Sequence, residues 1–177
     1  MKKRKSIVLI GMPGAGKSTL GVLLAKELAL DFVDTDVLIQ AREEKTLQEI
    51  MAESGYLNLR AIEGEVIAAA HLPSHVIATG GSAVYSEEGM ANLKELGTIV
   101  FLECSAEELR RRIHNYESRG IAKAPGQTFE ALFAERQALY REYADITVGC
   151  DGLTMQQALD QLLSQLPSRP QNGGRAP

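Results

Sequence analysis

Three residues that could act on a phosphate group, Lys17, Ser18 and Thr19, follow a glycine-rich segment. Residues 11–18 read GMPGAGKS, which fits the pattern G-x-x-x-x-G-K-[ST]. In such a loop, backbone N–H groups and the N-terminus of the next helix surround a phosphate. Lys17 would reach the β- and γ-phosphates of a nucleotide, and Ser18 would hold Mg²⁺. The residues predicted to contact the nucleotide are Gly14, Ala15, Gly16, Lys17, Ser18 and Thr19.

The flanks of this loop decide whether the pattern is meaningful, because it counts only between a strand and a helix. An apolar run at 6–10 precedes the loop, and a helical pattern covers 17–29 after it. The alternative, a glycine-rich turn with an exposed lysine, is therefore disfavoured.

Two carboxylates, Asp34 and Asp36, come at the end of the second apolar run, 31–34. Ligands gather at the carboxyl ends of strands in open α/β sheets, and residues two apart on a strand point the same way. Both carboxylates could therefore face the phosphate site, where a cation would relieve their repulsion. Capping by Thr35 or Asp36 of a helix that begins at Val37 explains these residues equally well.

Two arginines lie on predicted helices in positions that allow more than one role. Arg60 and Glu63 are neighbours on one helical face, for which a surface ion pair is the more ordinary interpretation. Arg136 falls on the apolar row of the helix at 128–143, so it needs an anionic partner or lies at the rim of a pocket. Alternatively, its stem covers the core and its guanidinium reaches water.

Two further groups of residues are candidates for ligand contacts. Gly80 and Gly81 end a strand, where a ligand could approach the backbone closely, although a simple turn explains them too. Three successive arginines at 110–112 mostly belong to a solvated helical face. We predict that Arg112 contacts the nucleotide together with Arg119, where both could neutralise a transferring phosphoryl group.

The wider pattern alternates short apolar runs with helix-period segments. The predicted strands cover 6–10, 31–34, 74–78, 98–102 and 145–148. The predicted helices cover 17–29, 36–53, 56–71, 87–96, 105–115, 128–143 and 154–165. Such alternation indicates a single α/β domain, at 1–166, with a parallel sheet covered on both faces. The tail at 167–177 lacks apolar periodicity and is predicted to be disordered.

The composition excludes several classes of protein. The net charge of −4 argues against a nucleic-acid-binding face. No run approaches the ~18 apolar residues of a membrane span, and the N-terminal residues lack a signal-peptide cleavage site. The two cysteines, Cys104 and Cys150, are far apart and lack metal-binding spacing, so we predict buried, reduced thiols. We therefore expect a cytoplasmic protein that binds neither membrane nor nucleic acid. Its expected partner is a small-molecule substrate, and its expected state is a monomer.

Together these motifs resemble those of the shikimate kinase family over nearly all of residues 6–165. The family's phosphate loop matches GMPGAGKST, and its D-x-D matches DTD at 34–36. Its F-R-x-x-E matches LRAIE at 59–63, and its T-G-G-G matches TGGS at 79–82. Its lid sequence R-P-L matches RGI at 119–121, and its E-R-x-x-x-Y matches ERQALY at 135–140.

The resemblance implies an ATP-dependent phosphorylation of the shikimate 3-hydroxyl and a role for each matching residue. Ser18 and Asp34 would hold Mg²⁺, the latter through water. Lys17, Asp36 and Arg119 would be catalytic. The acceptor would be bound by Asp36, Arg60, Gly80, Gly81 and Arg136. The implied fold is a three-layer P-loop NTPase with a five-stranded sheet in the order 2-3-1-4-5, a substrate-binding region near 34–62 and a lid near 113–127.

Three departures from the family pattern affect the choice of acceptor. Leu59 replaces an aromatic residue, Ser82 replaces the third glycine, and Gly120 replaces the lid proline after Arg119. A related kinase for another small hydroxy acid or sugar acid is therefore the alternative. A non-catalytic nucleotide-binding protein is a further alternative, although the N-K-x-D of GTPases is absent from the sequence.

Overall fold

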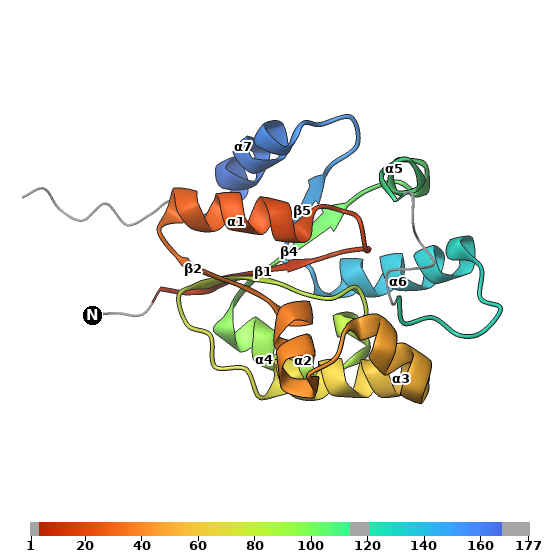
Figure 1. The fold of residues 1–177 in the computed structure, drawn as a ribbon. Coiled ribbons are helices and arrows are strands. Elements are labelled where there is room, and N and C mark those ends of the chain that lie inside the picture. The colour runs from red at the N-terminus through yellow and green to blue at the C-terminus, as the bar shows by residue number, and fades with distance from the viewer. Residues whose placement is uncertain (1–3, 114–120, 168–177) are drawn as a thin grey trace, which may run out of the picture.

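A computed structural model describes residues 4–113 and 121–167 of the chain. Within them, one parallel sheet has five strands in the order β2-β3-β1-β4-β5 (Figure 1). The strands are β1 (Ser6–Ile10), β2 (Asp31–Asp34), β3 (His75–Ala78), β4 (Gly97–Glu103) and β5 (Ile146–Gly149). The predicted α/β fold and strand order are thereby confirmed.

The helices cover both faces of this sheet and explain why its strands are apolar. They are α1 (Lys17–Leu28), α2 (Thr35–Glu43), α3 (Leu47–Ala68), α4 (Glu87–Leu96), α5 (Ala106–Arg112), α6 (Phe129–Tyr143) and α7 (Met155–Gln165). Helices α1 and α7 pack together on one face, while α4 and α6 contact the sheet on the other, with α3 against α4 (Figure 1). A central parallel strand between two helical layers must be apolar throughout, and β1 is buried along its whole length.

The predicted helix at 36–53 is wrong, because the chain divides this segment between α2 and α3. Glu44 takes φ 53° and ends α2. Thr46 then begins α3 with a capping box, in which its side chain accepts from Glu49 N and the Glu49 carboxylate accepts from Thr46 N. Within α3, Gly55 is non-helical at φ 80° and produces a kink. The kink at Gly55 lies in the gap between the predicted helices at 36–53 and 56–71, whereas the break at Glu44 was not predicted.

The parallel register brings the loops with the predicted site residues to one edge of the sheet. Ala78 of β3 is level with Leu9 of β1 and with Asp34 of β2. The segments that follow these three strands therefore leave the sheet side by side. The predicted lid lies partly, and the predicted tail mostly, outside the described residues. No helix within 4–113 and 121–167 is long and apolar enough to cross a bilayer.

Candidate active site

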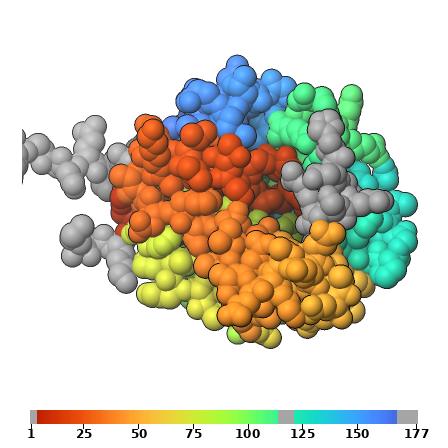
Figure 2. All heavy atoms as spheres, viewed as in Figure 1, coloured from red at the N-terminus to blue at the C-terminus, as the bar shows by residue number. Residues whose placement is uncertain are grey.

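A cavity of about 500 Å³ opens at this edge, between the glycine-rich loop, the segment after β3, and helices α3 and α6. Figure 2 shows the recess between the red segment around the loop and the orange segment that includes α2. Predicted site residues that line the cavity are Gly14, Gly16, Lys17, Ser18, Thr19, Asp36, Gly80, Gly81, Arg112 and Arg136. The structure thus unites residues that are far apart in the sequence.

The glycine-rich loop presents unpaired backbone donors to the cavity. Gly14 and Gly16 take φ 84° and 97°, in the left-handed region that favours glycine. Gly16 precedes α1 without a side-chain cap, and the first helical bond runs from Leu20 N to Gly16 O at 2.9 Å. The N–H groups of Lys17, Ser18 and Thr19 therefore have no helical acceptor. An anionic oxygen would accept hydrogen bonds from these N–H groups, so the loop fits a nucleotide phosphate.

Not every predicted member of the loop faces the cavity. Ala15 is buried, and its N–H donates to Met12 O at 3.1 Å within the loop. Its carbonyl accepts from Arg112 Nη1 at 3.3 Å. Ala15 thus contributes to the shape of the loop, and its amide is already paired.

Lys17 is a buried amine held against the loop. Its Nζ donates to Gly11 O at 2.8 Å and to Met12 O at 2.9 Å. Burial lowers the pKa of Lys17 to about 8, an effect that the carboxylates of Asp36 and Asp34 oppose. An incoming phosphate would supply the close anionic partner that this amine lacks.

Asp34 joins the loop to the beginning of α2. Its Oδ2 accepts from Ser18 Oγ at 2.5 Å, and its Oδ1 accepts from Asp36 N at 3.0 Å. Asp34 is therefore the N-cap of α2, which begins at Thr35, and the predicted cap at Thr35 or Asp36 is wrong. The Asp34 side chain also accepts a hydrogen bond from Ser18, whose hydroxyl is predicted to hold Mg²⁺. Asp34 can therefore cap α2 and still contribute to the site.

Asp36 and Glu63 place two carboxylates against the same side of Gly80. A Cβ added to Gly80 would lie 2.7 Å from Asp36 Oδ1 and nearer still to Glu63 Oε1. The absence of a side chain at Gly80 is what leaves room for both. Burial raises the pKa of Asp36 to about 6, with a further contribution from the Asp34 charge. Burial also raises the pKa of Glu63 to about 7, and the Asp36 charge adds to this.

Glu63 is the site residue that sequence reasoning placed wrongly. It is 3% exposed, lines the cavity and accepts a hydrogen bond from Ser82 Oγ, while its Oε1 is buried without a partner among the described residues. No ion pair joins it to Arg60 in the described part of the chain, so the expected surface pair is absent. Glu63 lies in the LRAIE motif, but three-residue spacing on a helix cannot distinguish a solvent-facing glutamate from a buried one.

Arg60 of α3 and Arg136 of α6 converge on a single backbone atom. Arg60 Nη2 donates to Ala122 O at 3.1 Å, and Arg136 Nη2 donates to the same oxygen at 2.7 Å. Their Cζ atoms lie 3.7 Å and 5.6 Å from the centroid of the Tyr85 ring. Arg136 is 1% exposed, and a Cβ on Gly81 would lie 2.7 Å from its Nη1. The interpretation in which the guanidinium of Arg136 reaches water is therefore wrong.

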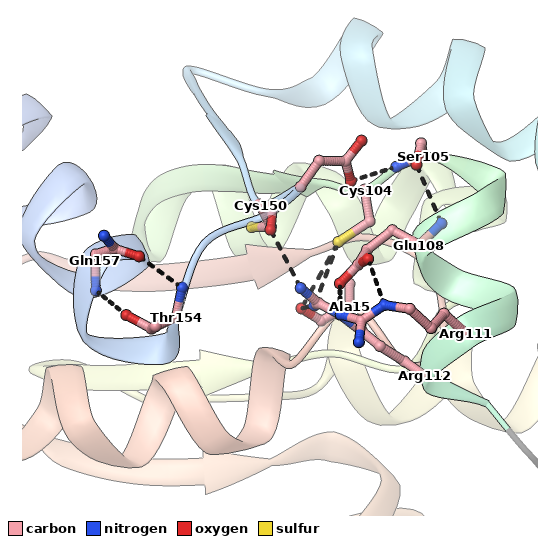
Figure 3. A network of polar contacts seen from close by, with 10 residues as sticks. Ala15, Cys104, Ser105, Glu108, Arg111, Arg112, Cys150, Thr154 and Gln157 are labelled. Atoms are coloured by element: carbon pink, nitrogen blue, oxygen red, sulfur yellow. Dashed lines mark hydrogen bonds and ion pairs between the residues drawn. The ribbon is translucent and has the colours of Figure 1, made fainter.

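Arg112 is fixed at the other end of the cavity by contacts to three segments (Figure 3). Its Nε donates to Glu108 Oε1 at 2.6 Å, and its Nη2 donates to Cys150 O at 3.2 Å. Arg111 also pairs with Glu108, and both Arg110 and Arg111 are exposed, as expected for most of the cluster. Arg119 lies outside the described residues.

Comparisons with known proteins identify the family to which the chain is similar. A family model described as shikimate kinase matches residues 13–167. A shikimate kinase of Bacillus mycoides is 34% identical over 163 residues, which cover 92% of this chain and 98% of that protein. One of Mycobacterium avium is 40% identical over 165 residues, which cover 91% and 93%.

A solved structure gives the same result. Shikimate kinase from Acinetobacter baumannii in complex with shikimate has a TM-score of 0.81 to this fold at 28% identity. The match covers 91% of this chain and 92% of that one. With a family model over most of its length and relatives above 30% identity, the chain belongs to the shikimate kinase family.

Proposed function

We propose that the protein transfers the γ-phosphoryl group of ATP to the 3-hydroxyl of shikimate, giving shikimate 3-phosphate and ADP. One observation carries the proposal: a single cavity contains the phosphate-type loop with Lys17 and the buried guanidinium of Arg136. Arg60, from a different helix, reaches the same Ala122 carbonyl as Arg136. This arrangement supports a site that binds a phosphate and a carboxylate side by side.

The two arginines would bind the acceptor's carboxylate. The Nε atoms of Arg60 and Arg136 are buried without a partner among the described residues. A carboxylate is the anion that fits paired guanidinium donors, and such bonds are charge-assisted. Holding the acid in this way would orient its ring against Gly80 and Gly81, and orientation alone accelerates transfer.

Asp36 would orient the acceptor's hydroxyl and accept its proton. A pKa of about 6 leaves this carboxyl mostly ionised at neutral pH, yet close enough to the working pH for effective proton transfer. Lys17 and Arg119 would offset negative charge on the transferring group. Arg119 keeps this assignment from the resemblance alone.

The residues present fit the nucleotide and its metal. ATP, when bound, supplies the phosphoryl group, and Mg²⁺ would offset the charge of its β- and γ-phosphates. Ser18 Oγ and the carboxylate of Asp34 would hold this ion, directly and through water. Mg²⁺ usually takes few protein ligands beside phosphate and water oxygens, and the described residues contain no group of three or more His, Cys, Asp or Glu side chains that could hold a metal alone.

We further propose that the protein acts as a cytoplasmic monomer. The large hydrophobic residues exposed in the described part are Val22, Val37 and Leu57, one on each of α1, α2 and α3. Single exposed apolar residues do not require an interface. Both cysteines are free, which suits a reducing compartment.

An ADP-release assay with a panel of acceptors tests the function directly. With ATP and Mg²⁺, shikimate should release ADP stoichiometrically with shikimate 3-phosphate, measured by phosphorus NMR, and Lys17→Ala should abolish transfer to any acceptor. Ser82 adds a side chain to the cavity beside Glu63, where a glycine would leave more room, so the preferred acid could differ from shikimate. Quinate and gluconate are therefore tested as alternative acceptors. Activity on another acid with none on shikimate would establish the alternative kinase. ADP release independent of any acid would indicate a nucleotide-binding protein without an acceptor.

A further inference from the structure

The two cysteines lie at matching positions on neighbouring strands. Glu103 of β4 pairs with Gly149 of β5, and Cys104 and Cys150 are the next residue in each case. Cys150 N donates to Glu103 O at 2.8 Å, so the parallel ladder continues to this position. Neighbouring strands lie about 4.8 Å apart, within the ~4.4–6.8 Å between Cα atoms that a disulfide spans. Both thiols are buried and free, as the sequence predicts, but the fold brings together two residues that lie far apart in the sequence.

The Cys104 side chain lies between a cation and a backbone carbonyl. Its Sγ lies 3.7 Å from Arg112 Nη1 and 4.0 Å from Ala15 O (Figure 3). The Cys150 side chain lowers the pKa of Cys104, and the Arg112 charge adds to this effect while burial opposes it; the pKa of Cys150 is raised. The Cys150 thiol itself donates to Val148 O at 3.4 Å. A cysteine beside an arginine, with a second cysteine at the matching position of the next strand, could act as a nucleophile and its resolving partner.

A second cavity lies beside the segment that contains Cys104. Its volume is about 520 Å³, and its lining includes Cys104, Phe133 and Gln137 of α6, and Gln161 of α7. Gln137 is 4% exposed, and both polar atoms of its amide are buried without a partner among the described residues. A cavity lined by an unpaired amide favours water or another polar molecule over an empty space. The cavity shares no lining residue with the candidate active site.

We propose that Cys104 and Cys150 form an oxidisable dithiol site, which a small hydroperoxide converts to an intramolecular disulfide. The Cys104 thiolate attacks the terminal peroxide oxygen, the O–O bond breaks, and protonation releases water from hydrogen peroxide. The Cys150 thiol then attacks the resulting sulfenic acid and displaces a second water. In total, two thiols lose two hydrogens and two electrons, and one peroxide is reduced to two waters.

Formation of this disulfide would alter the nucleotide end of the active site. Cys104 contacts Ala15 in the phosphate loop, and Arg112 bridges Cys104 to the backbone of Cys150. A sulfur that turns toward Cys150 gives up its contacts with both. We expect oxidation to weaken ATP binding several-fold and to leave shikimate binding less affected, an expectation that rests on the proposed function, whereas the disulfide itself does not.

Mass spectrometry of the native full chain tests the disulfide. The protein is treated with graded hydrogen peroxide at neutral pH, then alkylated with iodoacetamide after unfolding and weighed intact without reductant. Because the chain contains two cysteines, an unalkylated chain lighter by two hydrogens must carry this bond. Dithiothreitol should restore double alkylation, which separates the bond from methionine oxidation. Cys150→Ser should instead give a sulfenic acid at Cys104 that dimedone labels.

The outcomes separate the bond from its consequence. The proposed dithiol site would be overturned if the folded chain still carried two alkylated cysteines after peroxide treatment while the urea-unfolded chain formed the disulfide. The Cys150→Ser variant is checked by circular dichroism, and the wild-type measurement stands if that variant fails to fold. Binding of a non-hydrolysable ATP analogue, measured by calorimetry before and after oxidation, needs no enzymatic activity. Unchanged analogue affinity of the oxidised protein would overturn the coupling to the phosphate loop.

Discussion

Arg136 and Glu63 are buried charges whose partners inside the protein are incomplete. Arg136 donates to a neutral carbonyl, and Glu63 has an oxygen without a partner among the described residues. Burying such groups is unfavourable unless a partner is supplied. Both lie beside Gly80 and Gly81, where little bulk separates them from the cavity. These residues are best explained as groups whose pairing is completed by a ligand.

Replacing Arg136 tests this explanation. Arg136→Ala should lower kcat/KM for shikimate by about a hundredfold or more, because loss of one partner of a buried charge pair costs about 2–5 kcal/mol. The KM for ATP should change little. Arg141→Ala, on the same helix but exposed and paired with Glu103, is the matched control. Equal losses for acceptor and ATP would contradict a carboxylate-binding role.

The pH dependence of turnover reports on Asp36. Its pKa of about 6 in the folded protein means that acid below this value protonates the proposed proton acceptor. We expect kcat/KM for shikimate to be level near neutrality and to fall about tenfold per pH unit below this pKa. Initial rates measured from pH 5 to 8 give this fall of kcat/KM on the acid side. A profile that stays level down to pH 5 would show that ionised Asp36 is not required.

Residues in local motifs could be predicted from the sequence, whereas their partners could not. The phosphate loop follows from a pattern within eight consecutive positions, and the structure places five of these residues on the cavity. Arg60 depends instead on Ala122 and Tyr85, which reach it through the tertiary fold. From helical spacing alone, Glu63 is the nearest partner of Arg60, and the predicted ion pair between them was therefore wrong.

Helix α5 connects the nucleotide end of the site to the strands beneath it. Its Glu108 carboxylate holds Arg112, which in turn contacts Ala15 O and Cys150 O. One helix thereby fixes the phosphate loop relative to the segment after β5 (Figure 3). Hydrogen bonds from Arg111 and Arg112 lower the pKa of Glu108 to about 2, so it stays ionised throughout the working range.

Removal of this carboxylate charge should affect ATP specifically. Glu108→Gln leaves Arg112 without its anionic partner, so we expect the KM for ATP to rise several-fold with a smaller change in kcat. Glu107→Gln removes the same charge from the same turn at an exposed position and should resemble the wild type. Steady-state kinetics of both variants, with ATP varied at saturating shikimate, make the comparison. Identical ATP KM values in the two variants would exclude Glu108 as a positioning residue.

Elements with strong periodicity and a local capping signal were predictable, and boundaries set by an unusual backbone conformation or by tertiary contacts were not. Helix α7 matches its prediction closely because a T-x-x-Q capping box begins it and an amphipathic pattern runs through it. The break between α2 and α3 depends on a left-handed Glu44, a conformation that a glutamate rarely adopts and that no sequence pattern announces. Parallel pairing likewise brings Cys104 to Cys150 across 46 residues, which spacing along the chain conceals.

At the scale of the whole molecule, the active site reduces the stability of the fold. Glu63 has a pKa of about 7 against 4.5 for an ordinary glutamate, and Asp36 about 6 against 3.8. Between about pH 4 and 7, the folded state therefore binds more protons than the unfolded state. The free energy of unfolding falls with rising pH under that condition. The stabilisation is complete below the ordinary pKa values and is lost as pH rises through the folded ones.

Neutralising one buried carboxylate should therefore stabilise the ligand-free protein. Glu63→Gln keeps an oxygen for Ser82 and removes the ionisation, so its gain over the wild type at pH 8 should be on the order of 3 kcal/mol. At pH 4 the gain should vanish, because wild-type Glu63 is then protonated. Urea unfolding of both proteins at pH 4, 6 and 8 measures the difference, with exposed Glu95→Gln as the control. A gain of equal size at pH 4 and pH 8 would mean that packing, and not the buried charge of Glu63, sets its effect on stability.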